Sequence, residues 1–127
     1  MAGKLTLAAS ERLKSRKAID AVFAKNKCFH VFPFKICCNM VTEPGLKAAT
    51  GVSSRHFKKA TDRNRIKRLT REAWRIQKNT LREMLLQKNK GLHVFILYTG
   101  KEMPVYAAIA ETMLLVVQKL EKDLGKE

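Results

Sequence analysis

The stretch GLHVFILY, residues 91–98, decides the fold. It is a short, unbroken apolar run that opens on a glycine, and such a run is typical of a strand at the centre of a sheet. A helical pattern that begins near residue 60 ends just before it. A second helical pattern, apolar on most sides, follows from Pro104, where the missing N–H of proline does no harm in a first turn. We therefore expect a central strand between a long helix and a largely buried last helix.

The first half of the chain predicts one helix and further strands. Ser15 is a suitable N-cap for a helix over RKAIDAVFAK, residues 16–25. Residues 28–40 are rich in aromatic and β-branched side chains, and Pro33 interrupts them, so we expect strand with a break there. The turn TEPG precedes a strand over residues 46–53, which suggests a hairpin. The order helix, two or three strands, helix, strand, helix indicates an α+β fold or a split α/β sandwich.

The strand after Pro33 has two unlike faces. Side chains alternate across a strand, so every second residue shares a face. One face, which we expect in the core, holds Phe34, Ile36, Cys38 and Met40, and the other holds Lys35, Cys37 and Asn39.

The charge balance limits the function classes. The 127 residues suit one domain, and a hydrophobic fraction of 46% is enough for a core. Lys and Arg number 26 against 11 Asp and Glu, which gives a net charge of +15. Such a chain needs a polyanion nearby, either nucleic acid or an anionic membrane. We see no repeat or linker, and we expect residues 1–9 and 125–127 to be flexible.

Much of this charge lies on the long helix. Residues 55–82 hold eleven basic residues against Asp62 and Glu72, a net charge of +9. At about 100° per residue, the basic side chains fall within one arc and an apolar side opposes them. Like charges one turn apart repel, and a row of phosphates would offset that cost. A solvated face normally mixes both signs, so nucleic acid is favoured, with RNA and DNA both open. The arc holds Arg63, Asn64, Lys67, Arg68, Arg71 and Arg75, and the apolar side Ile66, Leu69, Ala73 and Ile76.

Residues 60–72, ATDRNRIKRLTRE, carry a resemblance to a known family. They resemble the RNR signature of the bacterial ribonuclease P protein component. The resemblance extends over nearly the whole chain, through Arg12-Leu13-Lys14, Val22-Phe23, the stretch GVSSR at 51–55 and HVFILY. The pattern R-N-x-x-K-R-x-x-R is complete at Arg63, Asn64, Lys67, Arg68 and Arg71.

The resemblance implies a fold and a partner. The fold is an αβββαβα two-layer sandwich with a mixed four-stranded sheet and a left-handed βαβ crossover, against the usual right-handed rule. The function is that of the protein subunit of ribonuclease P, which assists endonucleolytic removal of the 5′ leader from precursor tRNA. The catalytic RNA subunit, with its bound Mg²⁺, carries the hydrolysis, so no catalytic residue is expected on the protein, which alone should be inactive. The partners are ribonuclease P RNA and precursor tRNA.

Two sets of site residues follow from the resemblance. The signature helix lies on the RNA subunit, and a cleft between the first helix and the exposed sheet face holds the leader. Ile19 and Cys37 stand where aromatic residues are common in the family, and Lys101 is a substitute for a basic residue usual after the last strand. The RNA-subunit set is Arg63, Asn64, Arg65, Lys67, Arg68 and Arg71, preceded by Arg55, Lys58 and Lys59; the leader set is Ile19, Phe23, Lys35 and Cys37.

Several residues have a plainer explanation. Phe23 at helical spacing with Ile19 could be simple core, and Trp74 and the two phenylalanines around Pro33 are expected to pack inside. The three cysteines lack Cys-x-x-Cys spacing, so we expect reduced thiols in a cytoplasmic protein and no metal site. No carboxylate cluster is visible that could hold the two metals of a protein nuclease.

Two rival classes stay open on the sequence. A general RNA-binding module, such as a ribosomal protein or RNA chaperone, would share the charge but would not need the spaced signature. A membrane-surface protein would need one helix with exposed apolar and cationic faces. The last helix lacks a cationic face, and the basic helix needs its apolar side for the core, so we expect no membrane partner. The sequence also implies no obligate protein partner.

Overall fold

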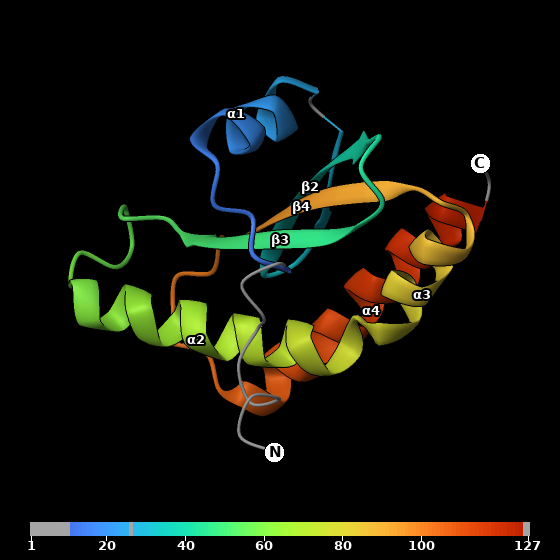
Figure 1. Cartoon of the computed structure of the whole chain (residues 1–127). Coiled ribbons are helices and arrows are strands. Elements are labelled where there is room, and N and C mark those ends of the chain that lie inside the picture. The colour runs from blue at the N-terminus through green and yellow to red at the C-terminus, as the bar shows by residue number, and fades with distance from the viewer. Residues whose placement is uncertain (1–10, 26, 126–127) are drawn as a thin grey trace, which may run out of the picture.

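A four-stranded sheet carries one helix on one face and three helices on the other (Figure 1). The computed structural model describes residues 11–25 and 27–125. The flexible ends expected at 1–9 and 126–127 lie outside them, while Gly125 closes the last helix. The expected α+β class is confirmed. The elements are α1 (Arg16–Lys25), β1 (Cys28–Val31), β2 (Phe34–Val41), β3 (Gly45–Val52), α2 (Ala60–Gln77), α3 (Asn79–Gln87), β4 (Gly91–Tyr98) and α4 (Tyr106–Gly125).

Strand β4 is central, as its apolar sequence predicts. The strand order is β1-β2-β4-β3, and β4 runs antiparallel to β2 and parallel to β3. The predicted hairpin between β2 and β3 is therefore wrong, because β4 lies between them. Gly91 makes this insertion possible: a Cβ there would lie 1.9 Å from the Glu43 carbonyl oxygen. Strands β3 and β4 are thus adjacent parallel strands joined through α2 and α3, a βαβ crossover.

The long helix expected before β4 is two helices that meet at Lys78. No glycine or proline marks the junction. Lys78 is buried, and its ammonium pairs with the Glu11 carboxylate at 2.6 Å, while Arg82 lies 3.6 Å from the same carboxylate. The partner is 67 residues away in sequence, so local sequence gives no sign of this pairing.

The main core lies between the sheet and helices α2, α3 and α4. Phe34 and Ile36 are fully buried there, as the alternation of β2 predicts, together with Trp74. Helix α4 buries one side only, since Leu114 and Leu115 remain exposed, so the expectation of a largely buried last helix is wrong. In the described residues, no helix is both long and apolar enough to cross a membrane.

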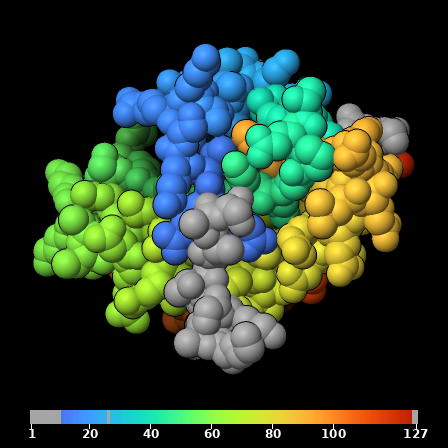
Figure 2. Space-filling model, viewed as in Figure 1, coloured from blue at the N-terminus to red at the C-terminus, as the bar shows by residue number. Residues whose placement is uncertain are grey.

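A smaller cluster lies on the other face of the sheet, beneath α1. Val22 and Leu13 are buried in it, and the Ser15 hydroxyl accepts the Ala18 N–H at 3.3 Å, which confirms the predicted cap. The Leu13 N–H donates to the Ala48 carbonyl at 2.9 Å, so this segment runs along the outer edge of β3. Figure 2 shows the same segment (blue) passing down the molecule between α2 and the strands.

The cysteines differ from expectation. Cys28 and Cys37 form a disulfide across β1 and β2, where they are direct partners with Cα atoms 4.1 Å apart. The prediction of three reduced thiols is therefore wrong for this pair. Neighbours in sequence cannot bridge because they point to opposite faces, but a cysteine on the next strand can. Cys38 is not in a disulfide.

Candidate nucleic-acid interface

Helix α2 presents a different face to the core than its sequence suggests. Its buried residues are Ile66, Thr70, Ala73 and Trp74, while Ile76 is 51% exposed, so Ile76 does not belong to the core side. The indole of Trp74 selects this face because it is the largest apolar group on the helix. Thr70 tolerates burial because its hydroxyl donates to the Ile66 carbonyl at 2.8 Å.

The solvent side of α2 is a basic row. Asn64, Arg65 and Arg68 are exposed, and Lys67 and Arg71 are half-buried beside them. The spacing of the sequence places Arg65 outside the basic arc. In the structure Arg65 lies on this row, because the buried face of α2 is rotated towards Trp74. In the described part of the chain, the recorded ion pairs do not involve Arg65, Lys67 or Arg68. Their charge is thus available to an anionic partner.

Arg63, the first residue of the signature, turns back to the loop before α2. Its guanidinium donates to the carbonyls of Phe57 and Lys58, each at 2.8 Å. Both bonds come from one guanidinium nitrogen, Nη1, whose two N–H groups can each meet a carbonyl. The loop it braces carries Arg55, Lys58 and Lys59, all exposed. Arg63 therefore also shapes the basic surface by holding this loop in place.

The basic row weakens towards the C-terminal end of α2. Arg75 pairs with Glu72 at 2.5 Å, and this hydrogen bond raises the pKa of Arg75. Burial and the neighbouring Arg12 guanidinium lower the pKa of Arg71, so a second arginine from the edge of β3 adds to the cluster. The dense unneutralised charge therefore lies on the first half of α2 and the loop before it.

A second surface lies between α1 and the open part of the sheet. Phe23 is 43% exposed, and its ring centre is 4.9 Å from that of Phe95 on β4. The Phe95 ring lies over Gly51, where a Cβ would be 2.8 Å from it. Lys35 and Leu97 are register partners on the same face. Two aromatic rings from separate elements thus meet beside α1, and Lys35 lies on the same face of the sheet.

Two of the predicted leader residues have a packing role in the structure. Cys37 is 1% exposed beneath α1 and is held in the disulfide, so its side chain offers no surface to a ligand. Ile19 is partly buried against the same cluster. The sequence interpretation missed Phe95, which supplies the second ring beside Phe23. The signal was present in β4, where His93, Phe95 and Leu97 alternate with the core residues Leu92, Val94 and Ile96.

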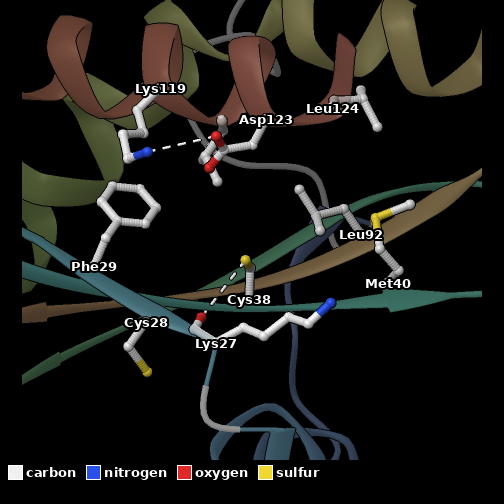
Figure 3. A pocket seen from close by; sticks show the side chains of 10 residues that line it. Lys27, Cys28, Phe29, Cys38, Met40, Leu92, Lys119, Asp123 and Leu124 are labelled. Carbon is white, nitrogen blue, oxygen red and sulfur yellow. Dashed lines mark hydrogen bonds and ion pairs between the residues drawn. The ribbon is translucent and has the colours of Figure 1, made fainter. Parts of the chain in front are cut away.

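A third concavity, of about 400 Å³, lies between β2 and the end of α4. Figure 3 shows Cys38 and Met40 directed into it from the strand, with Lys119 and Asp123 above. The Lys119 ammonium is 3.4 Å from Asp123 and 5.4 Å from the Phe29 ring centre, and the Cys38 thiol contacts the Lys27 carbonyl. The lysine is thus already engaged within the protein. Within residues 11–25 and 27–125, no three His, Cys, Asp or Glu side chains are grouped to hold a metal ion.

Comparisons with known proteins agree on one family. A family model described as ribonuclease P matches residues 7–121. A ribonuclease P protein component from Porphyromonas gingivalis strain W83 is 30% identical over 110 residues, 84% of this chain and 80% of that protein. The chain belongs to the ribonuclease P protein family. Another ribonuclease P protein component, from Desulfovibrio desulfuricans, is 30% identical over 114 residues, 89% of this chain and 85% of that one.

A solved structure gives the same fold. The Staphylococcus aureus RNase P protein has a TM-score of 0.66 to this chain at 20% identity, covering 88% of this chain and 95% of that one. The resemblance seen in residues 60–72 is thus confirmed. A ribonuclease P protein associates with ribonuclease P RNA and takes part in endonucleolytic tRNA processing. The basic row on α2 is an exposed cationic surface suited to contact with RNA phosphates.

Proposed function

We propose that this chain binds the catalytic RNA subunit of ribonuclease P through α2 and the 5′ leader of precursor tRNA through the α1 face. The observation that carries the first half is the row of Asn64, Arg65 and Arg68 on a helix that bears the family signature. Arginine forks bind phosphates in pairs of hydrogen bonds. The exposed loop with Arg55, Lys58 and Lys59 extends the row.

The second half of the proposal rests on Phe23 and Phe95. Exposed rings with a nearby cation suit single-stranded RNA, because every base has a face that can stack. Lys35 would neutralise a phosphate beside them. Ile19 contributes apolar contact at the rim, whereas Cys37 supports α1 from below. The protein therefore positions RNA and supplies no reacting group.

The division of labour belongs to the same proposal. Hydrolysis, with the Mg²⁺ it requires, is carried by the RNA subunit, and the protein alone is inactive. The protein lowers the Mg²⁺ demand because its cations neutralise phosphates that the metal would otherwise screen.

The test is cleavage of precursor tRNA by the cognate RNA subunit at low Mg²⁺, with and without purified protein. We expect the protein to stimulate cleavage and Arg68→Ala to reduce the stimulation. Cleavage by the protein alone, or no stimulation at any protein concentration, would contradict the proposal. Leu115→Ala, an exposed change on α4, is the matched control and should behave like the parent.

A further inference from the structure

An exposed apolar groove lies at the end of the sheet where β4 stops. Phe32, expected in the core, is instead 80% exposed on the turn between β1 and β2. Phe32 lines a groove of about 550 Å³ together with Met103, Pro104 and Tyr98. The volume is within the usual range for small-ligand sites. Phe32 and Met103 are both exposed on this groove, and an exposed apolar patch with a polar rim is typical of an interaction site.

The walls of this groove are held in place by hydrogen bonds. Thr99 donates to the Pro33 carbonyl from both its N–H, at 2.8 Å, and its hydroxyl, at 3.0 Å. The Tyr98 hydroxyl donates to the Glu102 carbonyl at 2.8 Å. The loop after β4 and the turn before β2 are therefore fixed relative to each other, so the groove exists before any ligand arrives.

The groove and the basic loop before α2 lie at the same end of the sheet. Tyr98 pairs with Val52 and with Phe34 in the sheet register, so the loops that follow β3 and β4 leave the same end of the sheet. The Phe57 ring centre lies 6.1 Å from that of Tyr98. Phe57 belongs to the loop that Arg63 braces and that carries Lys58 and Arg55. RNA lying on α2 and this loop thus passes close to the groove.

We infer that Phe32 and this groove take one unstacked nucleotide of the RNA subunit, its base on the Phe32 ring and its phosphate near Lys101. The inference rests on the proposed function in taking RNA as the ligand. Charge favours RNA over a protein partner: the loop from Ser53 to Lys59 carries three exposed cations and no acidic residue, and Lys101 stands on the groove. Glu102 is the one acidic residue among those that line it.

The experiment compares full-length variants in binding to three ligands: the RNA subunit, precursor tRNA bound to the holoenzyme, and mature tRNA bound to the holoenzyme. Phe32→Ala should weaken binding to the RNA subunit about tenfold, the size of a lost base–aromatic stack. Phe32→Tyr should restore it. Val105→Ala is the matched control, because Val105 is 67% exposed in the loop after β4, next to the lining residue Pro104, but does not itself line the groove. A loss with the RNA subunit supports the inference, and no loss with the RNA subunit contradicts it, whatever the two tRNA arms show.

Salt dependence separates stacking from phosphate contact. Phe32→Ala should leave the slope of log affinity against log salt unchanged, whereas Lys101→Ala should flatten it by about one. Unchanged melting temperature would confirm that Phe32→Ala folds, as expected for so exposed a side chain.

Three results would overturn the inference. In the first, Phe32→Ala binds all three ligands with unchanged affinity while Arg68→Ala still binds the RNA subunit weakly. That result would exclude the groove as a nucleotide site and would not affect the proposed function. Equal losses for Phe32→Ala and Val105→Ala would indicate a general apolar effect. Sedimentation could also show that the parent chain self-associates and that Phe32→Ala abolishes this without changing RNA affinity. The groove would then bind a second copy of the chain.

Discussion

The basic row on α2 and the predicted leader cleft beside α1 are built in opposite ways. The row comes from one helix, and each member is within a turn of the next, so spacing alone reveals it. The cleft brings Phe23 from α1 together with Phe95 from β4 and Lys35 from β2. Charge dominates the row and aromatic stacking the cleft. A surface made by one element can thus be read from sequence, whereas one made by several needs the fold.

The largest expected effect is on the row. Replacing Arg65 and Arg68 together by alanine removes two exposed cations without touching the core. We expect affinity for the RNA subunit to fall about 100-fold, since a hydrogen bond to a charged group contributes roughly 1.5–3 kcal/mol. The salt slope should flatten by about two. Filter binding over a salt series measures both, and an unchanged slope would mean that these arginines do not meet phosphates.

The next effect belongs to the cleft. Phe95→Leu keeps the apolar packing beneath α1 but removes a ring, so affinity for precursor tRNA should fall about tenfold. Phe95→Tyr should retain binding because it keeps the ring. Competition between precursor and mature tRNA for the holoenzyme is the measurement. If the leucine variant loses affinity for both equally, Phe95 supports the fold and does not contact the leader.

Arg63 belongs to the basic signature and also supports the fold. Its guanidinium holds the Phe57 and Lys58 carbonyls, so Arg63→Ala should lower the free energy of unfolding by about 1 kcal/mol. Arg68→Ala, the control, should leave it unchanged. Urea unfolding measures both. Equal stability of the two variants would show that Arg63 does not brace the loop.

The smallest effect is a pH dependence of folding stability that comes from His93, on the sheet face towards α1. Burial, helped by Lys47, lowers the pKa of His93 below its usual 6.5. The folded state therefore binds fewer protons than the unfolded state, and this part of the stability is complete above pH 6.5 and is lost as the pH falls below it. We expect the melting temperature to drop between pH 7.5 and 5.5, and to drop less in His93→Gln. Identical drops would exclude His93 as the cause.

The sequence predicts local features of this protein better than long-range ones. The cap at Ser15, the alternation of β2 and the central place of β4 are confirmed because each depends on neighbours in the chain or on uninterrupted burial. The separation of β2 from β3 depends on where β4 inserts, which the turn residues do not encode.

The errors within the site have the same origin. The rotation of the buried face of α2 depends on Trp74 packing against distant elements, and it leaves both Arg65 and Ile76 exposed. The partner of Cys37 is on another strand, and the fixed turn at Phe32 needs Thr99 from the end of β4. Each is a contact between segments far apart in sequence.

The most direct test of the account measures both surfaces in one holoenzyme. Arg68→Ala and Phe23→Ala are each assayed for affinity to the RNA subunit and for the ratio of precursor to mature tRNA affinity. We predict that Arg68→Ala lowers affinity for the RNA subunit and leaves the ratio of precursor to mature tRNA affinity unchanged. Phe23→Ala should lower that ratio and leave affinity for the RNA subunit unchanged. Equal changes in both quantities for both variants would contradict two separate surfaces.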